Sequence, residues 1–212
     1  MIIAVDGPTA SGKGTIAKRL AAHLGVPCLD TGLLYRAVGR QVAINGGNPD
    51  IAADALAACN FPDKLLEDEI LRTEESGSLA SRASVHPEVR EALFKRQRAF
   101  AEQPGGAVLD GRDIGTVIAP DADVKLFITA SVQSRARRRW LEMVEKKLDH
   151  EEEIPLSEIE KDVVARDARD INRKDAPLKA APDALVIDTT TFDREAAFEM
   201  VLEAVQEALN KR

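Results

Sequence analysis

Cysteine and aromatic residues are scarce in this chain of 212 residues, which holds two cysteines, one tryptophan, one tyrosine and six phenylalanines. Cys28 and Cys59 lack the spacing of a metal or redox site, so we expect small core residues in a reducing compartment rather than a disulfide. Trp140 alone provides no stacking platform for nucleic acid. The formal net charge of −7 also argues against a general nucleic-acid surface.

Long apolar runs are absent too. No stretch approaches the roughly 18 apolar residues that a membrane-spanning helix needs, and the negative charge gives no attraction to an anionic membrane. The first residues enter a strand directly, so we expect no signal peptide and a cytoplasmic location. With 44% hydrophobic residues, the chain can build one domain with a sizeable core.

A glycine-rich loop at residues 7–15 is the most informative feature that is present. It reads G-P-T-A-S-G-K-G-T, follows the apolar strand at 1–6 and precedes an amphipathic run. Backbone N–H groups of such a loop surround a phosphate, and its glycines permit close approach. Lys13 is expected near the β- and γ-phosphates of ATP, and Thr15 offers a hydroxyl to Mg²⁺. The helix that begins near Lys13 points its positive end at the same anion.

This register of strand, loop, lysine and helix argues against the alternative of a chance glycine-rich turn. The expected ATP-binding residues are Gly7, Pro8, Thr9, Ala10, Ser11, Gly12, Lys13, Gly14 and Thr15.

Strands alternate with helices over the rest of the chain. We expect further strands at 27–30, 107–110, 124–129 and 184–188, and helices at 33–44, 49–58, 87–101, 132–147, 156–173 and 194–209, with an acidic break at 149–155. The alternation predicts an α/β fold with a five-stranded parallel sheet and helices on both faces. Ligands of such sheets bind at the carboxyl ends of the strands.

Polar residues stand at three of these strand ends. Asp30 and Asp110 are placed where a carboxylate can hold the water ligands of Mg²⁺ near the loop, or each simply caps a turn. Residues 188–190 read D-T-T, for which we expect loop and helix-capping chemistry.

Arginines gather on the two helices expected at 132–147 and 156–173. They are Arg135, Arg137, Arg138 and Arg139 on the first and Arg166, Arg169 and Arg173 on the second. Arginine suits bidentate phosphate recognition and neutralises a transferring phosphoryl group. A solvated, salt-bridged helix face is the alternative, and it applies above all to Arg137 and Arg169.

Several segments together resemble bacterial cytidylate kinases. They are D-G-P at 6–8 leading into G-K-G-T at 12–15, D-T-G at 30–32 with Tyr35 and Arg36, R-E-A-L at 90–93 with R-Q-R at 96–98, D-G-R-D-I-G-T-V at 110–117, and R-D-x-x-D-x-N-R at 166–173 with A-P-L at 176–178. The match runs end to end. Many kinases share the phosphate loop, whereas the runs at 110–117 and 166–173 are far more specific.

The resemblance implies transfer of the γ-phosphate of ATP to CMP, and also to dCMP, in pyrimidine nucleotide metabolism. It implies Mg²⁺ as the metal, held by Thr15 and Asp110 partly through water. The expected partners are ATP and CMP or dCMP, without nucleic acid or membrane, and we expect a monomer.

The family's roles carry over by position. Arg36 and Arg112 resemble the pair that binds the 5′-phosphate of the monophosphate. The group that recognises cytosine corresponds to Ser81, Arg90 and Asp113. The residues that contact the sugar hydroxyls correspond to Asp170 and Arg173, supported by Arg166. Thr31 supplies a hydroxyl where the family more often has serine. Arg135, Arg138 and Arg139 fall in the lid helix, and the expected catalytic residues are Lys13, Arg112, Arg135 and Arg139.

The resemblance also divides the chain, as one P-loop kinase domain, into three parts. These are a core at about 1–35, 105–135 and 176–212, a monophosphate-binding segment at about 36–104, and a lid at about 136–175. Family members often carry a β-rich insertion before Arg72. Residues 60–71 here show little alternation and helix-like charge, which does not favour a full hairpin subdomain.

Two other classes share the loop. A GTPase switch needs N-K-x-D, but residues 172–175 read N-R-K-D, and no D-x-x-G follows the third strand. The remaining alternative is another P-loop kinase that acts on a small molecule, such as shikimate or dephospho-coenzyme A, or on a different nucleoside monophosphate. Such an enzyme would not require the D-G-R-D run.

Overall fold

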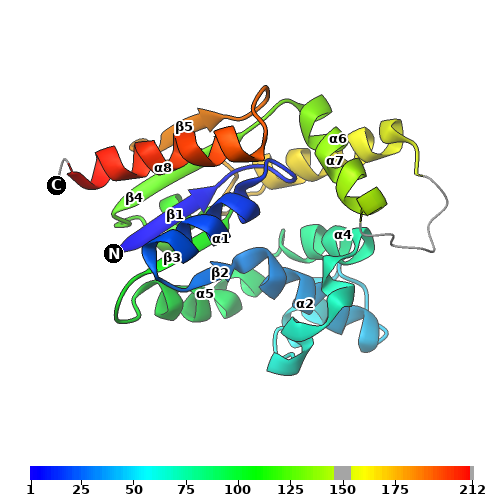
Figure 1. Cartoon of the computed structure of the whole chain (residues 1–212). Helices are drawn as coiled ribbons and strands as arrows, with labels where there is room; N and C mark the ends of the chain where they lie inside the picture. Colours follow the sequence, from blue (N-terminus) through cyan, green and yellow to red (C-terminus); the bar gives the residue numbers. More distant parts are fainter. Residues whose placement is uncertain (146–153, 211–212) are drawn as a thin grey trace.

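A five-stranded parallel sheet forms the centre of the computed structural model, which describes residues 1–145 and 154–210 (Figure 1). Its strands are β1 (Ile2–Asp6), β2 (Cys28–Asp30), β3 (Ala107–Gly111), β4 (Val124–Thr129) and β5 (Leu185–Asp188). They lie in the order β2-β3-β1-β4-β5, and every neighbouring pair is parallel. The predicted α/β fold and all five predicted strands are therefore confirmed.

The register aligns the strand ends that carry polar residues. Val5 pairs with Asp110 on β3 and with Leu126 on β4, and Asp30 pairs with Asp110 from the other side. The loops that follow β1, β2 and β3 consequently leave the same edge of the sheet. In Figure 1 this edge faces α4 and the α6–α7 pair, whereas the two chain termini lie at the opposite end.

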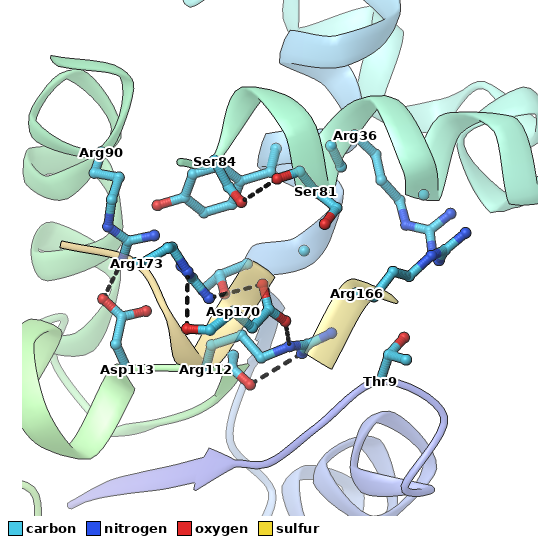
Figure 2. A pocket seen from close by; sticks show the side chains of 16 residues that line it. Thr9, Arg36, Ser81, Ser84, Arg90, Arg112, Asp113, Arg166, Asp170 and Arg173 are labelled. Carbon is cyan, nitrogen blue, oxygen red and sulfur yellow. Dashed lines mark hydrogen bonds and ion pairs between the residues drawn. The ribbon is translucent and has the colours of Figure 1, made fainter. Parts of the chain in front are cut away.

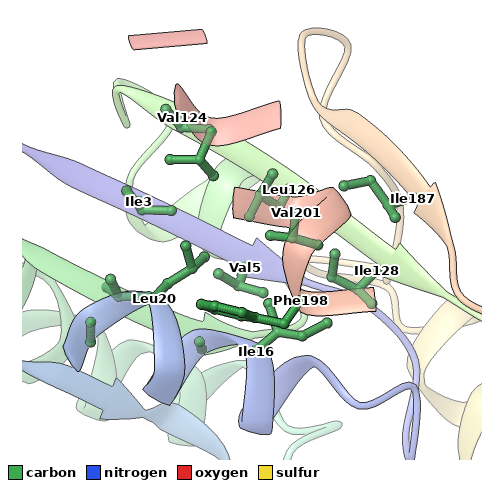
Figure 3. Packing of buried hydrophobic residues seen from close by; sticks show 14 residues of the cluster. Ile3, Val5, Ile16, Leu20, Val124, Leu126, Ile128, Ile187, Phe198 and Val201 are labelled. Carbon is green, nitrogen blue, oxygen red and sulfur yellow. The ribbon is translucent and has the colours of Figure 1, made fainter. Parts of the chain in front are cut away.

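Helices α1 (Lys13–Leu24) and α8 (Arg194–Asn210) cover one face of the sheet. Leu20 of α1 and Phe198 and Val201 of α8 pack against alternate residues of β1 and β4, such as Ile3 (Figure 3). Each fully buried side chain of this size contributes about 1.5–3 kcal/mol to stability. This cluster fixes the start of α1, and with it the end of the phosphate loop, relative to the strands.

The other face is covered by α2 (Thr31–Ile44), α5 (Pro87–Ala101) and a π-helical turn, η3 (Ile114–Ile118). Ala4 and Leu109 pack there against Ala101 and Ile114. Strands β1 and β3 are thus buried on both faces, which explains their continuous apolar sequence.

Two smaller packing units stand beyond the carboxyl edge. The first joins α2, α3 (Ala52–Ala57), α4 (Glu74–Ala83) and α5 around Leu34, Val38 and Leu71. The second joins α6 (Val132–Glu145) and α7 (Leu156–Ile171) around Ala136, Ile159 and Val163. No helix within 1–145 and 154–210 combines the length and apolar character needed to cross a bilayer.

Helix α4 was not predicted. Its sequence E-E-S-G-S-L-A-S-R-A is rich in serine and glycine, which disfavour helix interiors. A cap compensates at its start, because Thr73 Oγ1 accepts a hydrogen bond from Ser76 N.

Other boundaries differ by a few residues. Residues 60–71 lie across two short 3₁₀ helices, η1 (Asp63–Glu67) and η2 (Glu69–Arg72), with no hairpin in this described stretch. The helix predicted at 49–58 is shorter, and the one predicted at 156–173 ends at Ile171. Residues 146–147 of the helix predicted at 132–147, and 149–153 of the acidic break, lie outside the described residues.

The buried carboxylate of Asp6 fastens η3 to the end of β1. It accepts hydrogen bonds from Ile114 N and Gly115 N, each at 2.8 Å. Burial raises the pKa of Asp6 to about 7, and the two backbone donors counteract this rise. The Asp6 side chain thus joins the start of the D-G-P motif to the middle of the D-G-R-D-I-G-T-V motif.

We predict that Asp6→Asn destabilises the protein. An amide has one acceptor oxygen, so one buried backbone N–H loses its partner, at a cost of about 1–3 kcal/mol. The free energy of unfolding measured in urea tests this. Asp193→Asn is the control, because Asp193 accepts the N–H of Ala196 at the start of α8 and asparagine caps equally well. Equal stability of the two variants would contradict the role given to Asp6.

Candidate active site

The phosphate loop connects β1 to α1 in a backbone conformation that depends on glycine. Gly7 has φ +154°, and a Cβ there would lie 2.0 Å from the carbonyl oxygen of Ile128. The Lys13 side chain is buried beneath the loop and donates to Pro8 O at 3.3 Å. The loop has the strand–turn–helix context that its sequence predicts.

Lys13 faces a carboxylate that lacks hydrogen bonds. Its Nζ lies 3.8 Å from Asp110 Oδ1, which is buried and has no hydrogen-bond partner among the described residues. Burial, followed by repulsion from Arg112, lowers the pKa of Lys13 to about 8, and burial raises the pKa of Asp110 to about 6. Charged groups held with so few partners are typical of a site that receives a charged ligand.

Lys13, Asp110 and Arg112 line a cavity of about 240 Å³ on the carboxyl side of the sheet, the loop cavity. Thr15 and Asp30 line it as well. Asp30 stands at the N-cap position of α2 but makes no side-chain capping bond, so the structure does not support the capping alternative for it. Asp188, in contrast, accepts the N–H of Thr190 at 2.8 Å, as expected for a turn.

A second, narrower cavity of about 80 Å³ adjoins the first (Figure 2). All nine residues predicted to surround the monophosphate line it: Thr31, Arg36, Ser81, Arg90, Arg112, Asp113, Arg166, Asp170 and Arg173. They come from α2, α4, α5 and α7 and from the segments that follow β3 and α7. Residues far apart in the sequence therefore meet where the motifs predict one site.

Carboxylates hold several of these arginines in place. Asp170 accepts from Arg112 Nε and from Arg173 Nη2, each at 2.9 Å. Asp113 forms a buried ion pair with Arg90. Figure 2 shows the Arg90–Asp113 pair next to the group formed by Asp170, Arg112 and Arg173.

Other lining residues bond to the backbone. Arg36 Nη1 donates to Leu71 O at 2.7 Å and to Thr73 O at 2.9 Å. The Thr31 hydroxyl donates to Asp110 O at 2.8 Å. Burial lowers the pKa of Arg36 to about 10 and also lowers the pKa of Arg166 and of Arg173. A cavity that holds buried cations is suited to an anionic ligand.

The arginines of α6 and α7 take different positions. Arg139 lines the loop cavity, whereas Arg135 lines none of the three cavities described here. Arg135 instead donates to Thr9 O at 3.0 Å, Ala130 O at 2.9 Å and Asp167 at 2.6 Å. Arg137 is exposed, and Arg169 donates to Ser81 Oγ at 2.9 Å.

A third cavity, of about 250 Å³, lies on the other side of the loop and was not predicted. Ser11, Ile16, Arg138, Thr189 and Phe192 line it. Arg138 donates to Ser11 O, to Thr189 Oγ1 and to Phe192 O at 3.0–3.3 Å. The arginine cluster and the D-T-T turn were visible in the sequence, but nothing there indicated that Phe192 joins them.

Comparison with known proteins agrees with this geometry. The family model for cytidylate kinase matches residues 3–207. A cytidylate kinase of Methylocella silvestris is 50% identical over 209 residues, which cover 98% of this chain and 95% of the relative. One from Cereibacter sphaeroides (strain ATCC 17023) is 52% identical over 204 residues, which cover 96% of this chain and 94% of the relative.

A solved structure supports the fold alone. The crystal structure of an uncharacterized protein from Eubacterium ventriosum matches with a TM-score of 0.54 at 16% identity, covering 97% of this chain and 98% of the other. The family match and the close relatives confirm the resemblance indicated by the motifs. This chain belongs to the cytidylate kinase family.

Proposed function

We propose that this protein transfers the γ-phosphate of ATP to CMP, and to dCMP, giving ADP and CDP or dCDP. One observation carries the proposal beyond family membership. Arg36, Arg112 and Arg166 line both the loop cavity and the narrower cavity, so the two cavities meet at these three arginines. Phosphoryl transfer requires donor and acceptor phosphates side by side with their charge neutralised, and this junction suits both needs.

The donor occupies the loop in this proposal. The backbone of residues 7–15 surrounds the phosphates, and Lys13 places its positive charge next to them. The third cavity, with Arg138 and Phe192, offers an apolar space for the base of ATP beside the loop. Arg139 neutralises donor phosphates from the lid, and Arg135 acts indirectly by holding the loop backbone at Thr9.

The acceptor occupies the narrower cavity. Arg36 and Arg112 hold its phosphate, with Thr31 beside them, and Asp170 and Arg173, supported by Arg166, hold its sugar hydroxyls. Ser81, Arg90 and Asp113 read cytosine, which presents an amino donor next to the acceptors N3 and O2. A carboxylate, a guanidinium and a hydroxyl form a complementary set for that edge.

The residues present fit a bound Mg²⁺. The buried oxygen of Asp110 that lacks a hydrogen bond, together with the Thr15 hydroxyl, provides hard oxygen ligands, partly through water. Within 1–145 and 154–210 no group of three acidic, histidine or cysteine side chains gathers, so phosphates and water would complete the shell. When bound, the ion neutralises charge on the phosphates.

The chemistry needs little beyond positioning. An oxygen of the CMP phosphate, already ionised, attacks the γ-phosphorus; the new P–O bond forms while the bond to the β-phosphate oxygen breaks, and ADP leaves. Lys13, Arg36, Arg112 and Arg139 offset the charge, so no strong base is required. Closure of the lid over the donor excludes water that would otherwise hydrolyse ATP.

The division into core, monophosphate segment and lid forms part of this proposal, as does a cytoplasmic monomer. Both nucleotide cavities are lined by residues of one chain, so a second copy is not needed to complete the site.

We predict ADP production from ATP that depends on CMP and on Mg²⁺. A panel of CMP, UMP, AMP, shikimate and no acceptor, each with coupled detection of ADP, measures it. CMP should give the highest kcat/KM, and chelation of Mg²⁺ should abolish turnover. Efficient use of another acceptor without CMP-dependent turnover would reject the assignment.

We predict that Lys13→Met lowers turnover at least about 100-fold, because methionine keeps the aliphatic bulk and removes the charge from the phosphates. Circular dichroism should show the fold retained. Lys18→Met provides the control, since Lys18 is exposed on the same helix and should tolerate the change. Near-normal turnover of the Lys13 variant would count against its role.

We predict a CMP preference over UMP of at least about tenfold in kcat/KM, since the Asp113 carboxylate can only accept hydrogen bonds and an unpaired buried group costs about 1–3 kcal/mol. Asp113→Asn should narrow this ratio, mainly by harming CMP. Asp121→Asn is a matched control, because Asp121 also pairs with an arginine of α5, Arg98. An unchanged ratio in the Asp113 variant would leave Asp113 as scaffolding for Arg90.

A further inference from the structure

Glu74 joins two arginines of the lid to the monophosphate segment. It is the first residue of α4. Its Oε2 accepts a hydrogen bond from Arg166 Nη2 at 2.6 Å, and its backbone carbonyl accepts from the same nitrogen at 3.1 Å. Its Oε1 forms an ion pair with Arg139 Nε. One carboxylate therefore binds one guanidinium from α7 and one from α6.

The other carboxylates of these arginines belong to the lid itself. Arg139 also pairs with Glu142 at 3.3 Å, three residues on, and Arg166 with Asp162 at 2.7 Å, four residues back. The side chains of Glu142 and Asp162 are 39% and 38% exposed, against 21% for Glu74. In the described part of the chain, the better-buried contact is thus the one that crosses from the lid to α4.

Helix α4 also leaves space for the side chains of Arg166 and Arg36. Gly77 lies one turn after Glu74 on the same face. A Cβ on Gly77 would lie 2.6 Å from Arg166 Nη1 and 3.1 Å from Arg36 Nη2. Figure 2 shows the ends of Arg36 and Arg166 side by side at this point. The helix therefore supplies a carboxylate at one position and, a turn later, the space in which two guanidinium groups approach each other.

Charge explains why a carboxylate is needed there. Glu74, Arg139 and Arg166 line the loop cavity together with Lys13 and Arg112. Burial lowers the pKa of Arg139 and of Arg166, which reflects the cost of their charge in this place. Without a shared anion, the two cations would repel each other and regain the conformational freedom of long side chains. With Glu74 in place the trio retains one net positive charge.

Arg139 keeps hydrogen-bonding capacity for a ligand. Its Nη2 is buried and has no hydrogen-bond partner among the described residues. Glu74 pairs with Nε, a different nitrogen of the guanidinium. The carboxylate can thus orient Arg139 without occupying the nitrogen available to a phosphate.

We propose that Glu74 is a positioning residue for phosphoryl transfer: its carboxylate holds Arg166 at the junction of the two cavities and Arg139 at the adjoining wall of the loop cavity, so that both cations are in place when donor and acceptor phosphates meet. The inference rests on the proposed function. In this proposal Glu74 acts through the two arginines.

Glu74→Gln tests this, with Glu75→Gln as the matched control. Glu75 is the next residue of α4, is exposed and experiences the same helix dipole. We expect the Glu74 variant to lose at least about tenfold in kcat with the accepted acceptor, with smaller changes in both KM values, and the control to match the parent. A kcat within about twofold of the parent, or an equal loss in the control, would overturn the proposal.

A second set of variants separates positioning from a purely structural contact. In an Arg139→Lys background, Glu74→Gln should cost at least about threefold less in kcat than in the parent, because the lysine cannot offer the same fork. An equal factor in both backgrounds would overturn the coupling.

Glu74→Asp covers the case in which the glutamine variant does not fold. It keeps the charge but is one methylene too short to hold both arginines, so we expect a kcat loss of at least about threefold in a folded protein; unaltered kcat would reject the proposal. A parent protein without CMP-dependent turnover would instead reject the proposed function, and the same variants would then be assayed with the acceptor that the parent uses.

Discussion

Parallel pairing of β1 with β3 is the constraint on which the rest of the structure depends. The register sets Val5 beside Asp110 and Asp6 beside Gly111. It brings the phosphate loop, the Asp110 carboxylate and the D-G-R-D segment to one edge, and Asp6 then fixes the turn that follows. A slip of one residue would turn Asp110 to the opposite face of the sheet, away from Lys13.

Beyond that edge, electrostatics adds to apolar packing. The helices there have cores of their own: a large one joins α2, α3, α4 and α5, and a small one of Ala136, Ile159 and Val163 joins α6 and α7. Contacts in this part of the molecule also use pairs of buried arginines that share one carboxylate. Asp170 and Glu74 are two such shared carboxylates. A carboxylate between two guanidinium groups lowers the cost of burying both, which lets the protein concentrate positive charge where anionic ligands meet.

Much of this architecture could be predicted from the sequence, because its signals are local. Apolar runs followed by polar residues located the strands, and the loop motif located the start of α1. Helix α4 was missed because its serines and Gly77 disfavour a helix interior, while Gly77 leaves room for the side chains of Arg36 and Arg166. The contact of Glu74 with Arg166 spans 92 residues and leaves no periodic trace. The bonds that turn Arg135 toward the loop backbone arise in the same way from tertiary contacts.

The junction of the two cavities has an evolutionary consequence. Arg36, Arg112 and Arg166 line both cavities, whereas Ser81, Arg90 and Asp113 line only the narrower one. Ser81, Arg90 and Asp113 are thus physically separate from the residues that line the loop cavity. Mutations could redirect such a protein to a different acceptor without disturbing the cations at the junction, which makes specificity and chemistry independently evolvable traits in a single domain.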